Sequence, residues 1–156
     1  MADRTIEEVD AANASSWSKT ILTPREALDE ARTALAMAEE LGYPKGQADA
    51  YLNIGWSSYY TSRLPEALGA FTEALKRYEE LDDSLGLSKA LNAFGVHHHS
   101  RFLLDKAIER YTQSLEVARA NGHVERELIA MANLGEVCLE LGNPHEALNY
   151  LIPAYD

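Results

Sequence analysis

The sequence has a single cysteine and few basic residues. Cys138 stands alone among 156 residues, which excludes an intrachain disulfide. Lysine and arginine number 14 against 25 aspartates and glutamates, which gives a formal net charge of -11. Binding to a nucleic-acid backbone depends on clustered lysine and arginine, so this balance argues against a nucleic-acid partner.

Long apolar runs are also missing. No run approaches the roughly 18 apolar residues of a membrane span, and the charged start, Met1 to Glu8, lacks the apolar centre of a secretory signal. Hydrophobic residues make up 46% of the chain, which is ordinary for a globular domain. These features predict a soluble, cytoplasmic protein in a reducing compartment, with no membrane partner.

Several residue types recur along the chain at an interval of 40 residues. The recurring columns are Gly55, Gly95 and Gly135; Ala27, Ala67, Ala107 and Ala147; Leu35, Leu75 and Leu115; and the bulky Phe71, Tyr111 and Leu151. So many columns in one register indicate an internal repeat. We interpret the chain as a single array over 1–156, with a degenerate unit 1–40, units 41–80 and 81–120, and a truncated unit 121–156.

Each unit is expected to form two antiparallel helices. Thr23 and Asn143 each precede a proline and then a glutamate, an order that favours a capped helix start. Gly42, Gly122 and Gly142 lie where left-handed residues end helices. The pattern predicts no strand, and it predicts helices near 4–20, 24–41, 45–61, 65–81, 85–101, 105–121, 125–141 and 145–155.

The columns resemble the tetratricopeptide repeat. Its pattern of an aromatic, Leu-Gly, Tyr, then Ala and Phe is matched by Tyr51, Ile54-Gly55, Ser58, Ala67 and Phe71; by Leu91, Phe94-Gly95, His98, Ala107 and Tyr111; and by Met131, Leu134-Gly135, Cys138, Ala147 and Leu151. The period of 40 exceeds the usual value of about 34. The sequence is therefore similar to the long-repeat arrays of kinesin light chains, Pins-type adaptors and bacterial signalling regulators. The resemblance covers roughly residues 20–156 and implies an all-α, right-handed α-solenoid of antiparallel helix pairs.

Charge is concentrated on the second helix of each pair. Residues 65–80 carry six charged side chains, whereas 45–60 carry only Lys45 and Asp49. The second helices are therefore expected to form the convex wall, and the first helices a concave surface of aromatic and amide residues. A surface of that composition is typical of a peptide groove.

We predict ten peptide-binding residues on this surface. Trp56, Tyr59 and Tyr60 would be apolar anchors, Asn53, Asn92 and Asn133 clamps on the ligand main chain, and Lys89 a charge selector, with Val96, His99 and Glu136 at equivalent positions. An amide side chain both donates and accepts hydrogen bonds, so it can pair with any peptide backbone. The long-repeat resemblance implies this backbone-binding role. The alternative is that the asparagines bond neighbouring helices.

The remaining reactive residue types fit structural roles. Three consecutive histidines, His97 to His99, diverge by about 100° per residue on a helix and cannot converge on one metal ion. His98 falls in the buried aromatic column, and Cys138 in a buried packing column. Nucleophile elbows, phosphate-binding glycine loops and paired cysteines are absent. We therefore predict no catalytic residue, no metal and no cofactor.

Two functional hypotheses follow. The first is a non-catalytic protein–protein interaction module or signalling scaffold that binds an extended or helical peptide in a concave groove. The alternative is an N-terminal regulatory segment of a larger bacterial signalling protein, whose cyclase, kinase or DNA-binding output domain lies beyond residue 156.

The last expected helix, 145–155, is apolar on its outer side. It carries Leu148, Ile152 and Tyr155, together with an interior proline, Pro153. Because a terminal repeat needs a polar outer face, this pattern predicts a truncated protein. It also predicts self-association as a homodimer through residues 125–155.

Overall fold

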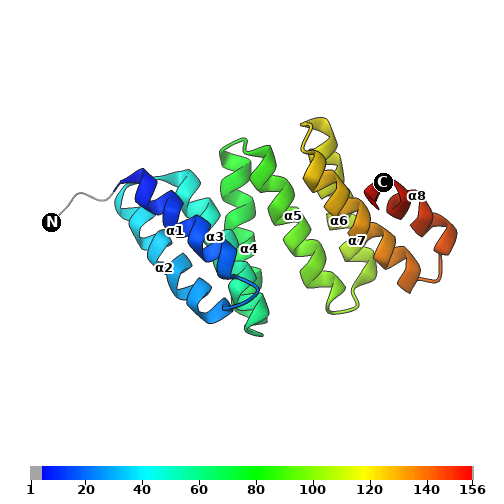
Figure 1. Cartoon of the computed structure of the whole chain (residues 1–156), viewed down its shortest axis with the longest axis horizontal. Helices are drawn as coiled ribbons and strands as arrows, with labels where there is room; N and C mark the ends of the chain where they lie inside the picture. Colours follow the sequence, from blue (N-terminus) through cyan, green and yellow to red (C-terminus); the bar gives the residue numbers. More distant parts are fainter. Residues whose placement is uncertain (1–4, 156) are drawn as a thin grey trace. The chain divides into compact units, whose positions relative to one another are not determined.

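The computed structural model describes residues 5–155, which form eight α-helices and no strand (Figure 1). The helices are α1 (Ile6–Lys19), α2 (Pro24–Glu40), α3 (Pro44–Tyr60), α4 (Leu64–Glu80), α5 (Ser84–His99), α6 (Leu104–Ala120), α7 (Val124–Glu140) and α8 (Pro144–Tyr155). The predicted boundaries lie within two residues of these, apart from the start at residue 4, which falls outside the described residues. The all-α prediction is confirmed. No helix in this part of the chain is long and apolar enough to cross a membrane.

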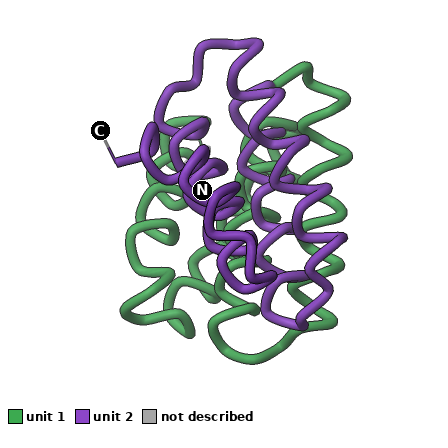
Figure 2. The backbone as a smooth tube through the Cα atoms, turned by 90° about the vertical axis from the view of Figure 1, so that its right-hand side faces the viewer, with its two compact units in different colours: residues 1–83 green, residues 84–156 purple. Residues whose placement is uncertain are grey.

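The helices are grouped in two compact units, residues 1–83 with α1–α4 and residues 84–156 with α5–α8 (Figure 2). In the first unit α3 contacts α1, α2 and α4, and in the second unit α7 contacts α5, α6 and α8. The helices α3, α5 and α7 begin at residues 44, 84 and 124, which matches the predicted interval. The division into four repeats of one array stays a prediction.

A left-handed residue recurs in the turns at every twentieth position. The predicted Gly42, Gly122 and Gly142 have φ of 59°, 69° and 76°, which confirms their role in ending helices. Ser62, Asp82 and Phe102 occupy the same position in the other turns, with φ of 62°, 53° and 56°. A residue with a Cβ is strained there, and most of all a bulky one.

The helix starts differ from expectation at one residue. Thr23 makes no side-chain hydrogen bond to the start of α2, because its ψ of 64° departs from the extended conformation that aims a capping oxygen at the first turn. Its prediction as a capping oxygen was wrong. Thr5 instead forms a full capping box with Glu8 at the start of α1, with bonds of 3.0 and 3.2 Å. The signal for that cap is the Thr-x-x-Glu pattern at residues 5–8.

The glycine and bulky columns pack against each other within helix pairs. A Cβ built on the glycine would lie 2.3 Å from Phe71 at Gly55, 2.3 Å from Tyr111 at Gly95 and 2.5 Å from Leu151 at Gly135. Only glycine allows this approach, so the structural role predicted for these columns is confirmed.

Candidate functional site

The aromatic residues predicted as anchors form one cluster at the carboxyl end of α3. The Trp56 ring stacks on Tyr60 at 6.0 Å and 24°, and meets Tyr59 edge-on at 5.9 Å and 84°. Phe71, from the core of the α3–α4 pair, packs edge-on against the same indole at 5.4 Å. Contact with three rings holds Trp56 in one orientation, which lowers the entropy lost when a ligand binds.

Residues of α1 and the turn that follows it complete a small apolar cavity beside this cluster. The cavity measures about 180 Å³ and is lined by Trp17, Thr20, Ile21, Trp56 and Tyr60, which we call the aromatic pocket. Trp17 is 47% exposed and Tyr60 44%, although both are large and apolar. The aromatic pocket therefore leaves unburied the side chains that contribute most to protein interfaces.

Trp17 and Ile21 were not among the residues predicted from the sequence. The repeat register aligns Trp17 with Ser57, His97 and Val137, none of which has a ring of the indole type and all of which are buried. Because the first unit is degenerate, the repeat columns do not predict an exposed tryptophan at residue 17. The available signal was the tryptophan itself, one turn beyond the Asn13 column.

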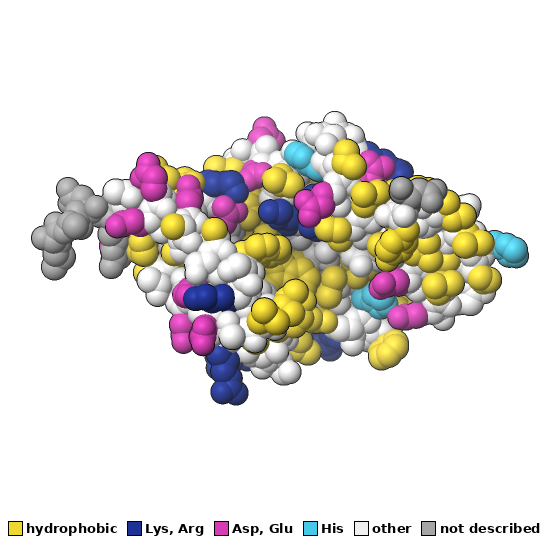
Figure 3. All heavy atoms as spheres, viewed as in Figure 1, with side chains coloured by type: hydrophobic (Ala, Val, Ile, Leu, Met, Phe, Trp, Pro, Cys, Tyr) yellow, Lys and Arg dark blue, Asp and Glu magenta, His cyan; other side chains and the backbone are white. Residues whose placement is uncertain are grey.

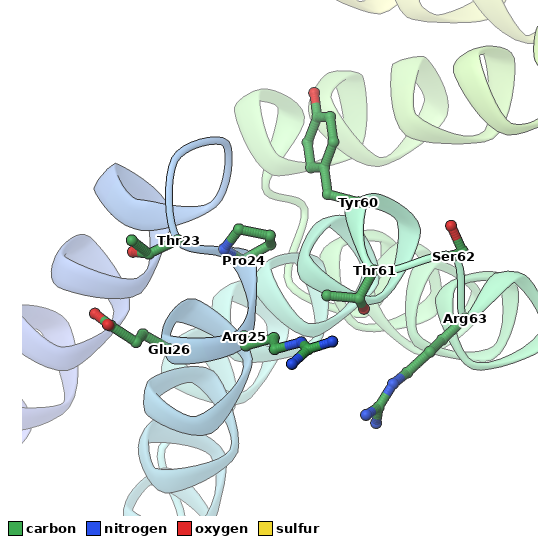
Figure 4. A pocket seen from close by; sticks show the side chains of 8 residues that line it. All are labelled: Thr23, Pro24, Arg25, Glu26, Tyr60, Thr61, Ser62 and Arg63. Carbon is green, nitrogen blue, oxygen red and sulfur yellow. The ribbon is translucent and has the colours of Figure 1, made fainter.

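A second, more polar cavity adjoins the first. It measures about 490 Å³, and we call it the turn pocket; it is lined by Thr23, Pro24, Arg25, Glu26, Tyr60, Thr61, Ser62 and Arg63. Figure 4 shows the guanidinium groups of Arg25 and Arg63 on the same side of this pocket, whereas Glu26 points away from them. Arg63 lies 3.6 Å from Glu66, and within residues 5–155 no carboxylate pairs with Arg25.

The asparagines bond to neighbouring helices. Asn53 is buried on α3, and its Nδ2 donates to the backbone oxygen of Asn13 at 3.0 Å and to its Oδ1 at 3.3 Å. Asn13 in turn donates to the backbone oxygen of Gly46 at 3.0 Å. In the second unit Asn133 donates to Oδ1 of the buried Asn92 at 2.7 Å. These hydrogen bonds are the ones expected if the asparagines join neighbouring helices. Their role as clamps on a ligand main chain stays a prediction.

The other predicted residues lie in the second unit and are not brought to one point. Lys89 is half-buried on α5, and Glu136 is exposed on α7. Val96 packs on the core of the second unit. His99 places its Nε2 3.0 Å from Oε1 of Glu140, so the imidazole already has a carboxylate partner. The clearest concentration of binding features is therefore in the first unit.

The histidine run differs from expectation in which ring is deepest. His97 is only 2% exposed, whereas His98, expected in the buried column, is half-buried. The column of His97 also holds the buried Ser57 and Val137, and that of His98 holds the buried Ser58 and Cys138, so the repeat register does not distinguish the two histidines. Burial lowers the pKa of His97, and the charge of Arg101 lowers it further. The Nδ1 atoms of His97 and His98 have no hydrogen-bond partner among the residues described.

Reactive chemistry finds little support elsewhere. Cys138 is buried as predicted, and burial followed by the charge of Glu146 raises the pKa of its thiol, which disfavours the reactive thiolate. Across residues 5–155, no group of three or more histidine, cysteine, aspartate or glutamate side chains is placed to hold a metal ion.

A polar network at the start of α3 was also missed. Lys45 lies 2.7 Å from Asp49 and 3.2 Å from Asp83, and the Tyr78 hydroxyl donates to Asp49 at 2.6 Å. Burial raises the pKa of Tyr78, and the negative charge of Asp49 adds to it. A phenol that stays protonated is a structural donor, so this network ties α3 to α4 and offers no general base.

Comparison with known proteins identifies the class. Residues 86–156 match the tetratricopeptide repeat family model. The chain is 28% identical over 123 residues to the human SH3 domain and tetratricopeptide repeat-containing protein 2; the match covers 77% of this chain and 10% of the human protein.

Two solved structures have a similar fold. BtubC (BKLC) from P. vanneervenii gives a TM-score of 0.72 at 21% identity, covering 84% of this chain and 55% of that one. Aspartyl phosphate phosphatase F from Bacillus subtilis gives 0.83 at 18% identity, covering 98% and 42%. The chain thus spans a tenth of the human relative and about half of each structure. The fold defines a helical-repeat protein. Residues 86–156 are similar to the tetratricopeptide repeat family, whose model they match.

Proposed function

We propose that the chain is a non-catalytic module that binds a peptide segment of a partner protein through the aromatic pocket of its first unit. The match of residues 86–156 to tetratricopeptide repeats supports a general role in protein–protein interaction. The observation that carries the specific proposal is the half-exposed aromatic pair Trp17 and Tyr60 around a cavity of about 180 Å³. Exposed aromatic side chains in a cavity are typical of interface hot spots.

The size of the aromatic pocket limits what it can hold. Small-molecule sites usually measure about 300–1,000 Å³, and the aromatic pocket is smaller than that range. It is therefore suited to one large apolar side chain presented by a peptide. Burial of such a side chain against Trp56 contributes most of the affinity, because truncating a hot-spot aromatic costs about 2 kcal/mol or more.

Peptide binding to a variant series tests this proposal. Wild-type protein would be screened against a display library of random 12-residue peptides, and the affinity of enriched peptides would be measured by calorimetry. Trp56→Ala should weaken binding about 30-fold, the equivalent of about 2 kcal/mol. Phe102→Ala removes an exposed aromatic ring outside the pocket and should leave affinity unchanged. A library with no enriched peptide, or full affinity in a folded Trp56→Ala variant, contradicts the proposal.

The non-catalytic part of the proposal stays a prediction. One structure with a similar fold is named a phosphatase, but at 18% identity the similarity indicates a shared fold and does not indicate a shared activity. A cytoplasmic scaffold role in signalling stays a prediction. So does the alternative of a regulatory segment of a larger bacterial signalling protein, which no observation favours over the peptide-binding module.

We also propose a homodimer through residues 125–155. Hydrophobic side chains gather over α7 and α8 in Figure 3, and Leu148, Ile152 and Tyr155 are at least half-exposed. The repeat register aligns Tyr155 with Leu115, which is buried in the core of its unit, and Leu148 with the buried Leu28 and with Leu68, which is 37% exposed. The outer side of α8 therefore has the composition of a packing surface.

Sedimentation equilibrium tests the dimer. Wild-type protein should associate at high micromolar concentration, and the exposed double substitution Leu148→Glu with Ile152→Glu should restore the monomer by burying repelling charges in the interface. A wild-type monomer at all concentrations contradicts the dimer and leaves the peptide-binding proposal intact.

A further inference from the structure

The two pockets of the first unit together specify the chemistry of a ligand. We infer that the recognised peptide places a large apolar side chain in the aromatic pocket and a neighbouring acidic side chain in the turn pocket, between Arg25 and Arg63. This inference rests on the proposed function and adds the type of partner, an acidic peptide with an apolar anchor.

The two pockets adjoin at one residue. Tyr60, the last residue of α3, lines both of them and is 44% exposed. It lines the cavity with Trp17, Ile21 and Trp56, and it also lines the larger cavity at the turns that precede α2 and α4. A peptide that fills the first cavity therefore has its next residues at the mouth of the second.

The charges of the turn pocket select an acidic residue. The chain has a formal net charge of -11, yet this pocket is lined by two arginines and one glutamate. Arg25 has no ion-pair partner within residues 5–155. Arg63 lies 3.6 Å from Glu66, but that carboxylate also pairs with Arg32. The two guanidinium groups that share one side of the pocket in Figure 4 can therefore bind a carboxylate from a ligand.

The overall acidity of the chain strengthens this selection. An acidic peptide is repelled by most of the surface, so the position of the arginine pair decides where it can dock. Because Arg25 and Arg63 are exposed, water and salt screen their attraction. We therefore expect the aromatic pocket to supply most of the affinity, and the arginines to supply a preference of roughly 3- to 10-fold that weakens with salt.

The sequence provides a built-in reporter. The chain has two tryptophans, Trp17 and Trp56, and both line the aromatic pocket. All tryptophan fluorescence of the chain therefore comes from residues that line this pocket, provided that the probe peptide contains no tryptophan.

The experiment titrates the full chain with synthetic, capped ten-residue Gly/Ser peptides that carry a central Phe-Glu-Glu. Matched peptides carry Phe-Gln-Gln, Phe-Lys-Lys or Ala-Glu-Glu. The Phe-Glu-Glu peptide should change the fluorescence and bind roughly 3- to 10-fold more tightly than Phe-Gln-Gln. Phe-Lys-Lys should bind more weakly still, and Ala-Glu-Glu should give no response. Raising NaCl to about 0.5 M should reduce the preference, since screening shortens the reach of exposed charges.

Variants assign the preference to its residues. The double substitution Arg25→Gln with Arg63→Gln should bind Phe-Glu-Glu and Phe-Gln-Gln equally, while Lys106→Gln, an exposed cation of the second unit, should keep the preference. Equal binding of the two peptides by wild-type protein, or no fluorescence response up to millimolar peptide, overturns the inference. The display library decides the proposed function separately: enriched peptides that bind in calorimetry without changing the fluorescence would place the site elsewhere, and enriched peptides without acidic residues would remove only the arginine preference.

Discussion

Replacing Gly95 by alanine should destabilise the second unit. A Cβ at this position would lie 2.3 Å from Cδ1 and Cε1 of Tyr111, and contacts under 3.0 Å are essentially absent from proteins. Tyr111 is 1% exposed and packs in the core of the unit with Leu115 and Leu134. Its ring therefore has no free space to move into, and the helices must separate.

The size of the effect follows from two opposing contributions. Overpacking a well-filled core costs about 1–3 kcal/mol, and a clash with a rigid ring belongs at the upper end. Alanine gains about 1 kcal/mol over glycine from helix propensity. The expected net loss is about 2 kcal/mol, or roughly 4–8 °C in Tm for a chain of this length.

Gly69 provides the matched control. It lies inside α4, is exposed, and has nothing within 4 Å of the position that an alanine Cβ would take, so Gly69→Ala should gain about 1 kcal/mol. Thermal and urea unfolding followed by circular dichroism at about 222 nm, the helix band, would compare Gly95→Ala, Gly69→Ala and the wild type. The two variants should differ by about 3 kcal/mol, since helix propensity is common to both. Equal shifts in Tm would refute the close-packing argument.

Three further changes test other features of the molecule. Phe102→Gly should raise the free energy of unfolding by about 1 kcal/mol, because φ of 56° strains a residue with a Cβ; Phe102→Ala keeps the strain and should show no such gain in thermal unfolding. Burial lowers the pKa of His97, so the unfolded chain binds a proton more readily, and stability should fall as pH drops from about 7 toward the lowered pKa. His97→Gln should flatten that slope in urea unfolding at several pH values. Asn53→Ala should lower the free energy of unfolding by about 1–2 kcal/mol, because it removes the hydrogen bonds to Asn13. An unchanged free energy of unfolding would contradict a structural role for these bonds.

The repeat made most of the fold predictable. Each helix boundary was supported by equivalent residues 40 positions away, so local ambiguity was averaged over several copies. Pairs such as Gly55 with Phe71 were predictable for the same reason, because a small and a bulky column keep a constant offset. Thr23 was mispredicted because its sequence context fits a cap, whereas capping depends on a backbone ψ that the preceding turn sets.

The candidate site was less predictable, because it depends on departures from the repeat. Trp56 and Tyr60 were found as aromatics on a face with little charge, but Trp17 lies in a unit whose columns are degenerate. Arg25 and Arg63 belong to turns, and only their placement around one cavity gives them a shared role. Sequence alone also leaves open whether an amide such as Asn53 faces a ligand or a helix, since the same hydrogen-bonding groups serve both.

The central claim is that the aromatic pocket of the first unit binds a peptide. The most direct test is a ¹H–¹⁵N correlation spectrum of the full chain, titrated with a peptide enriched from the display library. The two indole Nε1–H signals belong to Trp17 and Trp56, which line this pocket, so each signal reports on it. The proposal predicts that both indole signals shift or broaden in step with peptide concentration, with an affinity that matches calorimetry. Two indole signals that stay in place while calorimetry records binding would contradict it.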